Sequence, residues 1–349
     1  MRYKKYLVIG IIIGLISSCD NNSSTDQELT TINFDQISGV KFNDMDLKIH
    51  PGDDFNRYVS GGWFARTEIP ADKSRYGAFN ILRDGADADI RTIIDEAVAS
   101  DAEKGSNEQK VGDLYKSYID MSSRSALGLS PINNRMTKID AIIDLGGISK
   151  YMAEAGKYSY SSPLAFYISV DAKIPTEYSL HVYQAGLGLP DREYYFKEDE
   201  KSKLIRIKYI EHIEKMLALA DIQDGVKKAS QIMDLETKLA SFHWLKEDNR
   251  DANKRYNKYA IADFKKLLSN LDIDASLRII GAPEVRDIII NQPSFLKGFN
   301  TLLTSENLET WKLYLKWSLV NDMASSLNEE LDNQNFEFFG KTLSGLEEQ

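Results

Sequence analysis

DDFNRYVSGGWFART, residues 53–67, is predicted to form a helix because its apolar residues recur on one helical face: Phe55, Tyr58, Val59, Gly62 and Trp63. The middle of this helix contains Gly61 and Gly62. Each glycine inside a helix costs about 1 kcal/mol relative to alanine, so a pair needs a physical reason. The pair predicts that another backbone lies so close that a Cβ atom would not fit. We expect that backbone to belong to a part of the molecule outside this sequence.

The composition limits the class of protein. The 349 residues are 42% hydrophobic, which is enough for one large domain or two ordinary ones. The formal net charge is −10, and the sequence has no basic stripe of the kind that binds phosphate backbones. We therefore expect no nucleic-acid partner.

The N-terminus has the pattern of a bacterial lipoprotein signal. Arg2, Lys4 and Lys5 precede an apolar run over residues 7–16, which is shorter than the about 20 residues that span a bilayer. Small residues then precede Cys19, the only cysteine of the chain. This order predicts a signal peptide over residues 1–18, a lipid on Cys19 and a place in the bacterial cell envelope, with the inner or outer membrane left open. An ordinary secretory signal with an incidental cysteine is the alternative.

The rest of the chain is expected to be a tether followed by one domain. Residues 19–40 are polar and poor in apolar side chains, which is typical of a flexible tether. Beyond them the sequence shows no internal repeat and no linker rich in proline and glycine. We therefore predict one domain over residues 41–349.

Apolar periodicity predicts a mainly helical fold. The longer helices are expected over residues 74–100, 131–145, 198–220, 224–246, 261–270 and 307–331. Gly146 and Gly147 are expected to end the second of these as a C-terminal cap. Residues 163–186 are instead rich in β-branched and aromatic residues and predict a small β-hairpin. DIIIN, residues 287–291, fits either a short strand or the start of a buried helix.

The search for catalytic or metal-binding residues yields little. None of the four histidines belongs to an HExxH motif, which would place two zinc ligands one helical turn apart. Glu236, His243 and Glu247 could share one helical face, but we interpret them as a solvated face rather than a metal site. His181 is expected to be a surface histidine. The residues alone therefore assign no catalytic group and no metal ligand.

Segments distributed along the chain resemble one family in the correct order. They are DDFNRYVSGGWFARTEIP followed by SRYGAFNILRD, QAGLGLPDREYYF (184–196), NRDANKRYN (249–257), QPSFLKGFN (292–300), WKLYLKWSL (311–319) and NFEFFGKTLSG (335–345). Together they resemble the neprilysin-type zinc endopeptidases. The similarity extends from about residue 53 to residue 345, which is nearly the whole mature chain.

The resemblance implies a mainly α fold with two lobes around a large cavity. In that family the N-terminal part builds mostly the cap lobe, and a thermolysin-like catalytic lobe carries HExxH and a downstream glutamate ligand. This chain is expected to be the cap lobe with a small β-hairpin, and its sequence ends before the catalytic lobe. No cofactor is therefore expected in this chain, whereas zinc is expected for the full-length enzyme. Whether the chain alone is an enzyme stays open.

The resemblance also implies two substrate-binding residues, Arg75 in SRYG and Arg83 in ILRD. Family arginines at these positions help to bind the C-terminal side of the peptide substrate, and a guanidinium binds a carboxylate through two hydrogen bonds. If both lie on the helix predicted from residue 74, they are about 12 Å apart and contact different points of the peptide. Asn80 stands where relatives often carry an acid, which changes the charge balance of this subsite.

Two hypotheses follow for the function. The first is the N-terminal portion of a lipid-anchored, neprilysin-type zinc endopeptidase in a truncated sequence, with peptide substrates, the missing catalytic lobe and the membrane as partners. The second is a non-catalytic surface lipoprotein that uses the cap lobe as a peptide-binding or scaffold module. Only the first requires a reading frame that encodes HExxH beyond residue 349.

Overall fold

A computed structural model of the chain describes residues 41–158 and 160–349. The chain divides into two compact units, Met1–Glu68 and Ile69–Gln349, and each is described here by itself. The predicted signal peptide, the predicted tether and Cys19 lie outside the described residues. The described helices are too short or too polar to cross a membrane.

The smaller unit contains the helix predicted from the opening segment. It comprises the 3-10 helix η1 (Phe42–Asp44) and the helix α2 (Phe55–Arg66), whose first turn is capped when Asp54 accepts a hydrogen bond from the Arg57 amide. A Cβ atom on Gly62 would lie 2.6 Å from the carbonyl oxygen of Asn43, and one on Gly61 would lie 2.6 Å from Cβ of Asp46. The prediction of a close backbone is thus confirmed, but its expected origin was wrong, because the backbone belongs to this chain.

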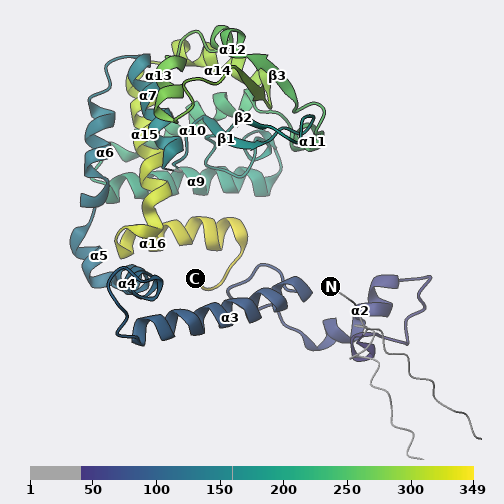
Figure 1. The fold of residues 1–349 in the computed structure, drawn as a ribbon. Helices are drawn as coiled ribbons and strands as arrows, with labels where there is room; N and C mark the ends of the chain where they lie inside the picture. The colour runs from purple at the N-terminus through teal and green to yellow at the C-terminus, as the bar shows by residue number, and fades with distance from the viewer. Residues whose placement is uncertain (1–40, 159) are drawn as a thin grey trace, which may run out of the picture. The chain divides into compact units, whose positions relative to one another are not determined.

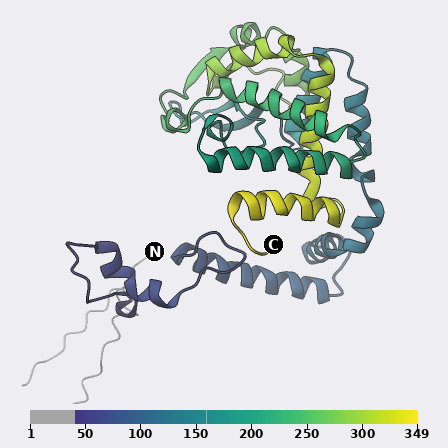
Figure 2. The same cartoon turned by 180° about the vertical axis from the view of Figure 1, so that it is seen from behind.

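The larger unit is mainly helical, as Figures 1 and 2 show. Its helices are α3 (Ala78–Ala99), α4 (Asn107–Ile119), α5 (Met121–Leu127), α6 (Ser130–Asp140), α7 (Leu145–Lys157), α8 (Glu193–Phe196), α9 (Glu200–Leu219), α10 (Gly225–Phe242), α11 (Lys246–Arg250), α12 (Ile261–Leu267), α13 (Ile273–Ile279), α14 (Pro293–Ser305), α15 (Leu308–Met323) and α16 (Glu329–Asn335). The 3-10 helix η2 (Ala324–Ser326) precedes α16, and the π-helix η3 (Phe336–Leu343) follows it. The predicted mainly α fold is confirmed.

A small mixed sheet interrupts the helices. β1 (Leu164–Val170) and β2 (Tyr178–Gln184) form the predicted antiparallel hairpin, in which Tyr167 lies opposite His181. Two further strands, β3 (Asn257–Ala260) and β4 (Asp287–Ile290), extend it to the order β1-β2-β4-β3, with β2 and β4 parallel. Residues 287–290 of DIIIN thus form a strand. The predicted two-stranded hairpin is part of a four-stranded sheet. β3 escaped prediction because its four residues, NKYA, carry no apolar alternation.

The core of this unit lies between the sheet and the central helices. β2 and β4 are buried on both faces: Leu180, Val182, Ile288 and Ile290 lie on the core side, and His181 and Ile289 on the other side are buried as well. α10 packs against α9, α14 and α15, which Figure 1 shows side by side. α15 is buried on most sides, as its wide apolar stripe predicts, and its Trp311 and Trp317 are almost fully enclosed. The predicted helix 307–331 ends at Met323, and Asn328 then caps a new helix by accepting from the Leu331 amide.

Candidate functional site

The SRYG segment before α3 is held by a small polar network. Asp84 on α3 accepts a hydrogen bond from the Tyr76 hydroxyl at 2.9 Å and pairs with the Lys73 ammonium at 3.0 Å. These two interactions lower the pKa of the Asp84 carboxyl. The Glu347 amide donates to the Ala71 carbonyl at 2.9 Å, so residues near the C-terminus lie beside the same segment.

The two predicted substrate-binding arginines are exposed but lie on different elements. Arg75 lies in the segment between Lys73 and Tyr76, three residues before α3 begins at Ala78. Its guanidinium has no hydrogen bond or ion pair with another described residue. Arg83 lies on α3 and pairs loosely with Asp87 at 3.6 Å. The spacing estimate based on one helix was therefore wrong, because Gly77 is extended at the start of α3. The role of both arginines stays a prediction.

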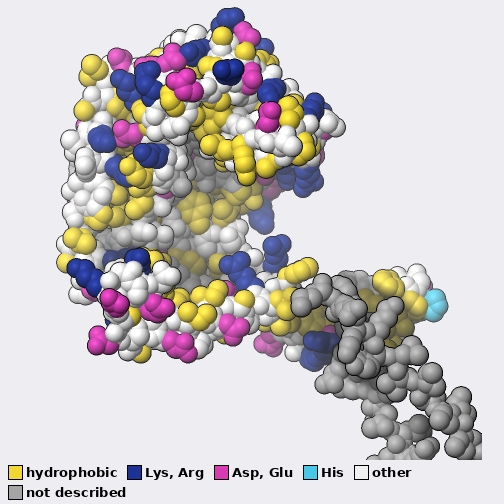
Figure 3. Space-filling model, in the orientation of Figure 1, with side chains coloured by type: hydrophobic (Ala, Val, Ile, Leu, Met, Phe, Trp, Pro, Cys, Tyr) yellow, Lys and Arg dark blue, Asp and Glu magenta, His cyan; other side chains and the backbone are white. Residues whose placement is uncertain are grey.

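An apolar stripe follows α3 along its exposed side. Phe79, Leu82, Ala86, Ile90 and Ile93 recur at helical spacing, and Phe79 is 89% exposed. The stripe becomes buried only towards Ala97, where α3 packs against α4 at Gly112. Figure 3 shows hydrophobic side chains between the charged ones along α3. A stripe of this kind is typical of a helix that another part of a protein covers.

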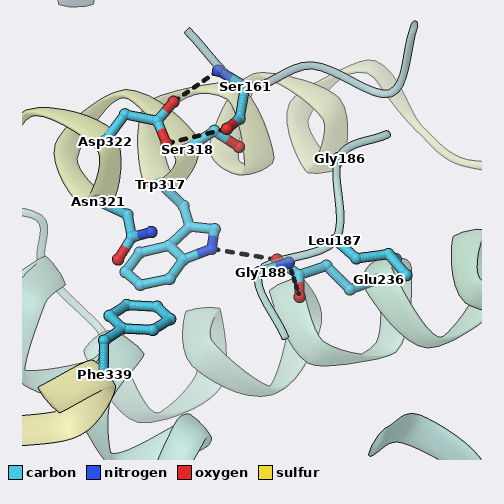
Figure 4. Close-up of a pocket in the computed structure, with 10 residues that line it drawn as sticks. All are labelled: Ser161, Gly186, Leu187, Gly188, Glu236, Trp317, Ser318, Asn321, Asp322 and Phe339. Atoms are coloured by element: carbon cyan, nitrogen blue, oxygen red, sulfur yellow. Dashed lines mark hydrogen bonds between the residues drawn. The ribbon is translucent and has the colours of Figure 1, made fainter. Parts of the chain in front are cut away.

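A buried carboxylate lies at the centre of the larger unit. Glu236 on α10 accepts hydrogen bonds from the hydroxyls of Tyr195 (2.7 Å) and Tyr209 (3.0 Å). It also accepts from the indole nitrogen of Trp317 (3.1 Å) and from the Gly188 amide (3.3 Å), as Figure 4 shows for the last two. Burial is the largest effect on its ionisation and raises its pKa to about 7, although the four donors act in the opposite direction.

A cavity of about 200 Å³ adjoins this carboxylate. Its other walls include Phe339, Asn321 and the segment from Gly186 to Gly188. Asp322 also lines it and accepts from the amide and the hydroxyl of Ser161 at 2.6 and 2.9 Å. Burial raises the pKa of Asp322. The hydrogen bonds of Glu236 connect the 186–188 segment to α10 and α15, and the carboxyl groups at the cavity can hold a proton. The described residues that line the cavity include no activated nucleophile.

The interpretation of Glu236, His243 and Glu247 as one solvated helical face was wrong. Glu236 and His243 are buried, and His243 contacts the Ala185 carbonyl at 3.2 Å through Nε2. Burial lowers the pKa of His243 to about 4. α10 ends at Phe242, so Glu247 lies on the separate helix α11 and is exposed. In residues 41–158 and 160–349, no three histidine, cysteine, aspartate or glutamate side chains are placed to hold a metal ion.

The expectation for His181 was also wrong, because this side chain is buried in the sheet. Its ring stacks on Tyr167 with centroids 4.6 Å apart. Burial is the largest effect on its ionisation and lowers its pKa. Ser179 and Tyr183 lie on the same side of the sheet, where Tyr183 is 39% exposed although His181 is buried. Asp171 lies there too, fully buried and hydrogen-bonded to Tyr256 and Ser179.

Sequence reasoning did not find the Glu236 cluster, although one signal for it existed. Gly188, Tyr194 and Tyr195 belong to the quoted segment QAGLGLPDREYYF. The glycine allows its amide to approach the carboxylate, and Tyr195 supplies a donor. Glu236 is 41 residues from Tyr195 in sequence, so no local pattern connects them.

Comparisons with known proteins agree with this architecture. Residues 51–349 match the N-terminal part of peptidase family M13. Endothelin-converting enzyme 1 of Rattus norvegicus is 26% identical over 315 residues, which cover 86% of this chain and 41% of the relative. The human protein of the same name is 25% identical over 314 residues, covering 86% of this chain and 40% of the relative.

Solved structures show the same fold. The zinc metalloprotease Zmp1 of Mycobacterium tuberculosis, solved with an inhibitor, superposes with a TM-score of 0.84 at 32% identity, covering 89% of this chain and 48% of Zmp1. PepO of Lactobacillus rhamnosis has a TM-score of 0.69 at 20% identity, covering 86% of this chain and 48% of PepO, and shows the fold alone. The chain thus spans less than half the length of these relatives.

The fold and these relatives define the class of the chain, a mainly helical fold shared with the N-terminal part of known metallopeptidases. The chain belongs to peptidase family M13, the neprilysin family. The resemblance inferred from the sequence segments is therefore confirmed.

Proposed function

We propose that this chain is the cap lobe of a membrane-anchored zinc endopeptidase that cleaves peptides once a catalytic lobe is joined to it. The chain matches only 41% of endothelin-converting enzyme 1 and 48% of Zmp1, which is a zinc metalloprotease. The described residues do not fit zinc, because they bring no sufficient ligand set together. The metal ligands and the catalytic base therefore belong to the proposed catalytic lobe, and no step of hydrolysis is assigned here.

The apolar stripe on α3 carries the proposal. Leu82 is 70% exposed, and Ile90 and Ile93 are more than half exposed. Covering one such side chain stabilises a protein by roughly 1.5–3 kcal/mol, so a second lobe that covers several gains a substantial docking energy. A free-standing binding module has no need for such a stripe, which favours the endopeptidase over the non-catalytic lipoprotein.

Arg75 and Arg83 are the proposed contacts to the C-terminal side of the peptide. Arg75 is suited to this role because its exposed guanidinium lies on a segment whose neighbours, Lys73 and Tyr76, are both fixed by Asp84. A fixed backbone lowers the entropy lost when the side chain binds a carboxylate. Arg83 is less constrained, since its one ionic partner among the described residues is Asp87 at 3.6 Å.

The proposal predicts that hydrolysis needs the coding sequence beyond residue 349. We expect the chain alone to leave a quenched fluorescent peptide intact, and the chain extended through a downstream reading frame with HExxH to cleave it in a chelator-sensitive manner. In the extended protein, Leu82→Glu should reduce kcat/KM at least about tenfold, because burying an unpaired charge opposes lobe docking. Arg75→Met should weaken cleavage of a free-acid peptide more than of its C-terminal amide.

Ile143→Glu is the matched control for the docking effect. Ile143 is 85% exposed and lies outside α3, so the same change should leave cleavage unchanged. Equal activity of the Leu82→Glu and wild-type extended proteins would show that α3 does not dock the catalytic lobe. A stop codon followed by unrelated sequence would instead favour the scaffold lipoprotein.

Membrane anchoring rests on the sequence around Cys19. We expect the wild-type protein to fractionate with membranes and to incorporate labelled palmitate, and Cys19→Ser to remove the label and release the protein. The reason is that a thiol is the acceptor of the lipid, and a hydroxyl does not replace it in this processing. Cys19→Ser protein that stays in the membrane fraction with an unchanged processed mass would contradict the lipoprotein assignment.

A further inference from the structure

β1 is an edge strand, because the sheet order places β2 on one side of it and no strand on the other. The Asp171 amide bonds to the Glu177 carbonyl, and the Ala185 amide bonds to the Pro163 carbonyl, so the odd-numbered residues face β2. Successive residues of an antiparallel strand direct their backbone groups to opposite sides. The N–H and C=O groups that point to the open edge are therefore those of Leu164, Phe166, Ile168 and Val170.

The open edge is capped at one end and free along the rest. The Ser162 hydroxyl donates to the Leu164 carbonyl at 2.7 Å. Within the described part of the chain, the outward groups of Phe166, Ile168 and Val170 have no hydrogen-bond partner. The exposed side chains there are apolar, since Ile168 is 66% exposed and Val170 is also exposed. Natural edges usually carry charges or bulges that prevent pairing, and this one carries neither at these positions.

A cavity adjoins the capped end of the edge. Its volume is about 300 Å³, and its walls include Gly156, Leu164, Ala165, Phe166 and Ala185. Tyr183 and Ser162 supply polar atoms to the same walls. Hydrophobic side chains also gather at the surface beside the sheet in Figure 3. The cavity is suited to one apolar side chain of a ligand that lies along β1.

We propose that an extended peptide segment adds to β1 as a fifth strand and places one apolar side chain in this cavity. Strand addition of this kind takes its affinity from backbone hydrogen bonds and its specificity from pockets for alternate side chains. The free groups from Phe166 to Val170 match a peptide of about six residues at roughly 3.4 Å per residue. The proposal rests on the proposed function only in taking peptides as the ligand class, and the site requires no catalytic lobe.

A second copy of the chain is a less suitable occupant than a peptide. If two β1 strands paired antiparallel about Ile168, the partner's turn after β1 would lie over the cavity instead of a continuing strand. A free peptide has no such turn and can continue past Leu164 into the cavity. Protection of the β1 edge requires added peptide if a peptide is the occupant. If a second copy is the occupant, protection depends on protein concentration instead.

The test uses the chain and a labelled peptide, acetyl-KVTVTVK-amide, in fluorescence polarisation and amide hydrogen exchange. The control peptide has the same sequence with the nitrogens of its three valines and two threonines methylated, which keeps the charge and removes the central strand-pairing donors on both edges of the peptide. We expect the methylated peptide to bind at least tenfold more weakly. We also expect the unmodified peptide to slow exchange of the Phe166, Ile168 and Val170 amides.

Two variants locate the binding on the strand. Ile168→Pro removes one outward donor without touching the ladder to β2, and Ile168→Lys adds a charge to the edge; each should weaken binding at least tenfold. Ile143→Lys changes an exposed isoleucine elsewhere and should leave binding unchanged. Equal binding of both peptides, or unchanged exchange at the three amides, would overturn the proposal. Protection of these amides that rises with protein concentration and ignores the peptide would overturn it in favour of pairing between two copies.

Discussion

Gly188→Ala is expected to lower the free energy of unfolding by at least about 3 kcal/mol. The new Cβ atom would overlap the hydroxyl of Tyr209 and lie 2.7 Å from its Cζ atom. Tyr209 is fully buried, and its ring packs against Trp317 and Phe338, so it has little room to move. If it does move, its hydroxyl leaves Glu236 and loses a buried hydrogen bond.

Chemical denaturation followed by tryptophan fluorescence measures this effect, because Trp317 lies in the same cluster. Gly85→Ala is the matched control. Gly85 lies on the exposed side of α3, and a Cβ atom there would meet no other atom within 4 Å. The same substitution should therefore stabilise that helix by up to about 1 kcal/mol. Equal unfolding free energies for Gly188→Ala and wild type would show that the Tyr209–Glu236 contact is not needed for the fold.

Glu236 should make the larger unit less stable as the pH rises from about 4.5 to 7. Its pKa is about 7 in the folded chain, against an ordinary value of 4.5, so the folded state binds more protons between these values. Stability falls with pH wherever the folded state holds the additional proton. The contribution is fully present below pH 4.5, is lost on passing pH 7, and amounts to about 3 kcal/mol at the most.

The comparison with Glu236→Gln isolates this contribution. His212 and His243 both have pKa values lowered to about 4 by burial, and they therefore act in the opposite direction between pH 4 and 6.5. Urea unfolding at a series of pH values gives the free energy of unfolding of each protein. The contribution of the histidines cancels in the difference between wild type and variant. We expect that difference to change by a few kcal/mol between pH 4.5 and 7 in favour of the variant. A difference that does not vary with pH would show that Glu236 stays ionised when buried.

Long helices with a regular apolar stripe could be predicted from the sequence, and their ends could not. α15 was found because its stripe is wide and its length exceeds four turns. Gly146 and Gly147 were predicted to end a helix, but they lie in the first turn of α7. Asp144 precedes them and accepts a hydrogen bond from the Gly147 amide at 2.8 Å, which makes it an N-terminal cap. Glycine permits both roles, and a single acceptor nearby decides between them.

The predicted and observed site differ for a related reason. Arg75 and Arg83 were identified because their motifs are contiguous in sequence, and the structure adds their surroundings without testing their role. The Glu236 cluster joins α10 to QAGLGLPDREYYF, α9 and α15, so its donors come from three distant segments. A charge on a helix is most often solvated, and only the tertiary contacts show that this one is enclosed. The same limit applies to His243 and His181.

The parallel pairing of β2 with β4 has a consequence for the order in which the chain folds during synthesis. The amide of Gln184 at the end of β2 bonds to Gln292, 108 residues further along the chain. Translation at about 5–20 residues per second leaves roughly 5–20 seconds between the two segments. The β1–β2 hairpin can form early, but during that interval both of its edges are open and its apolar face lacks the later strands. Both edges of this hairpin are therefore available to a holding chaperone or a neighbouring nascent chain during that interval.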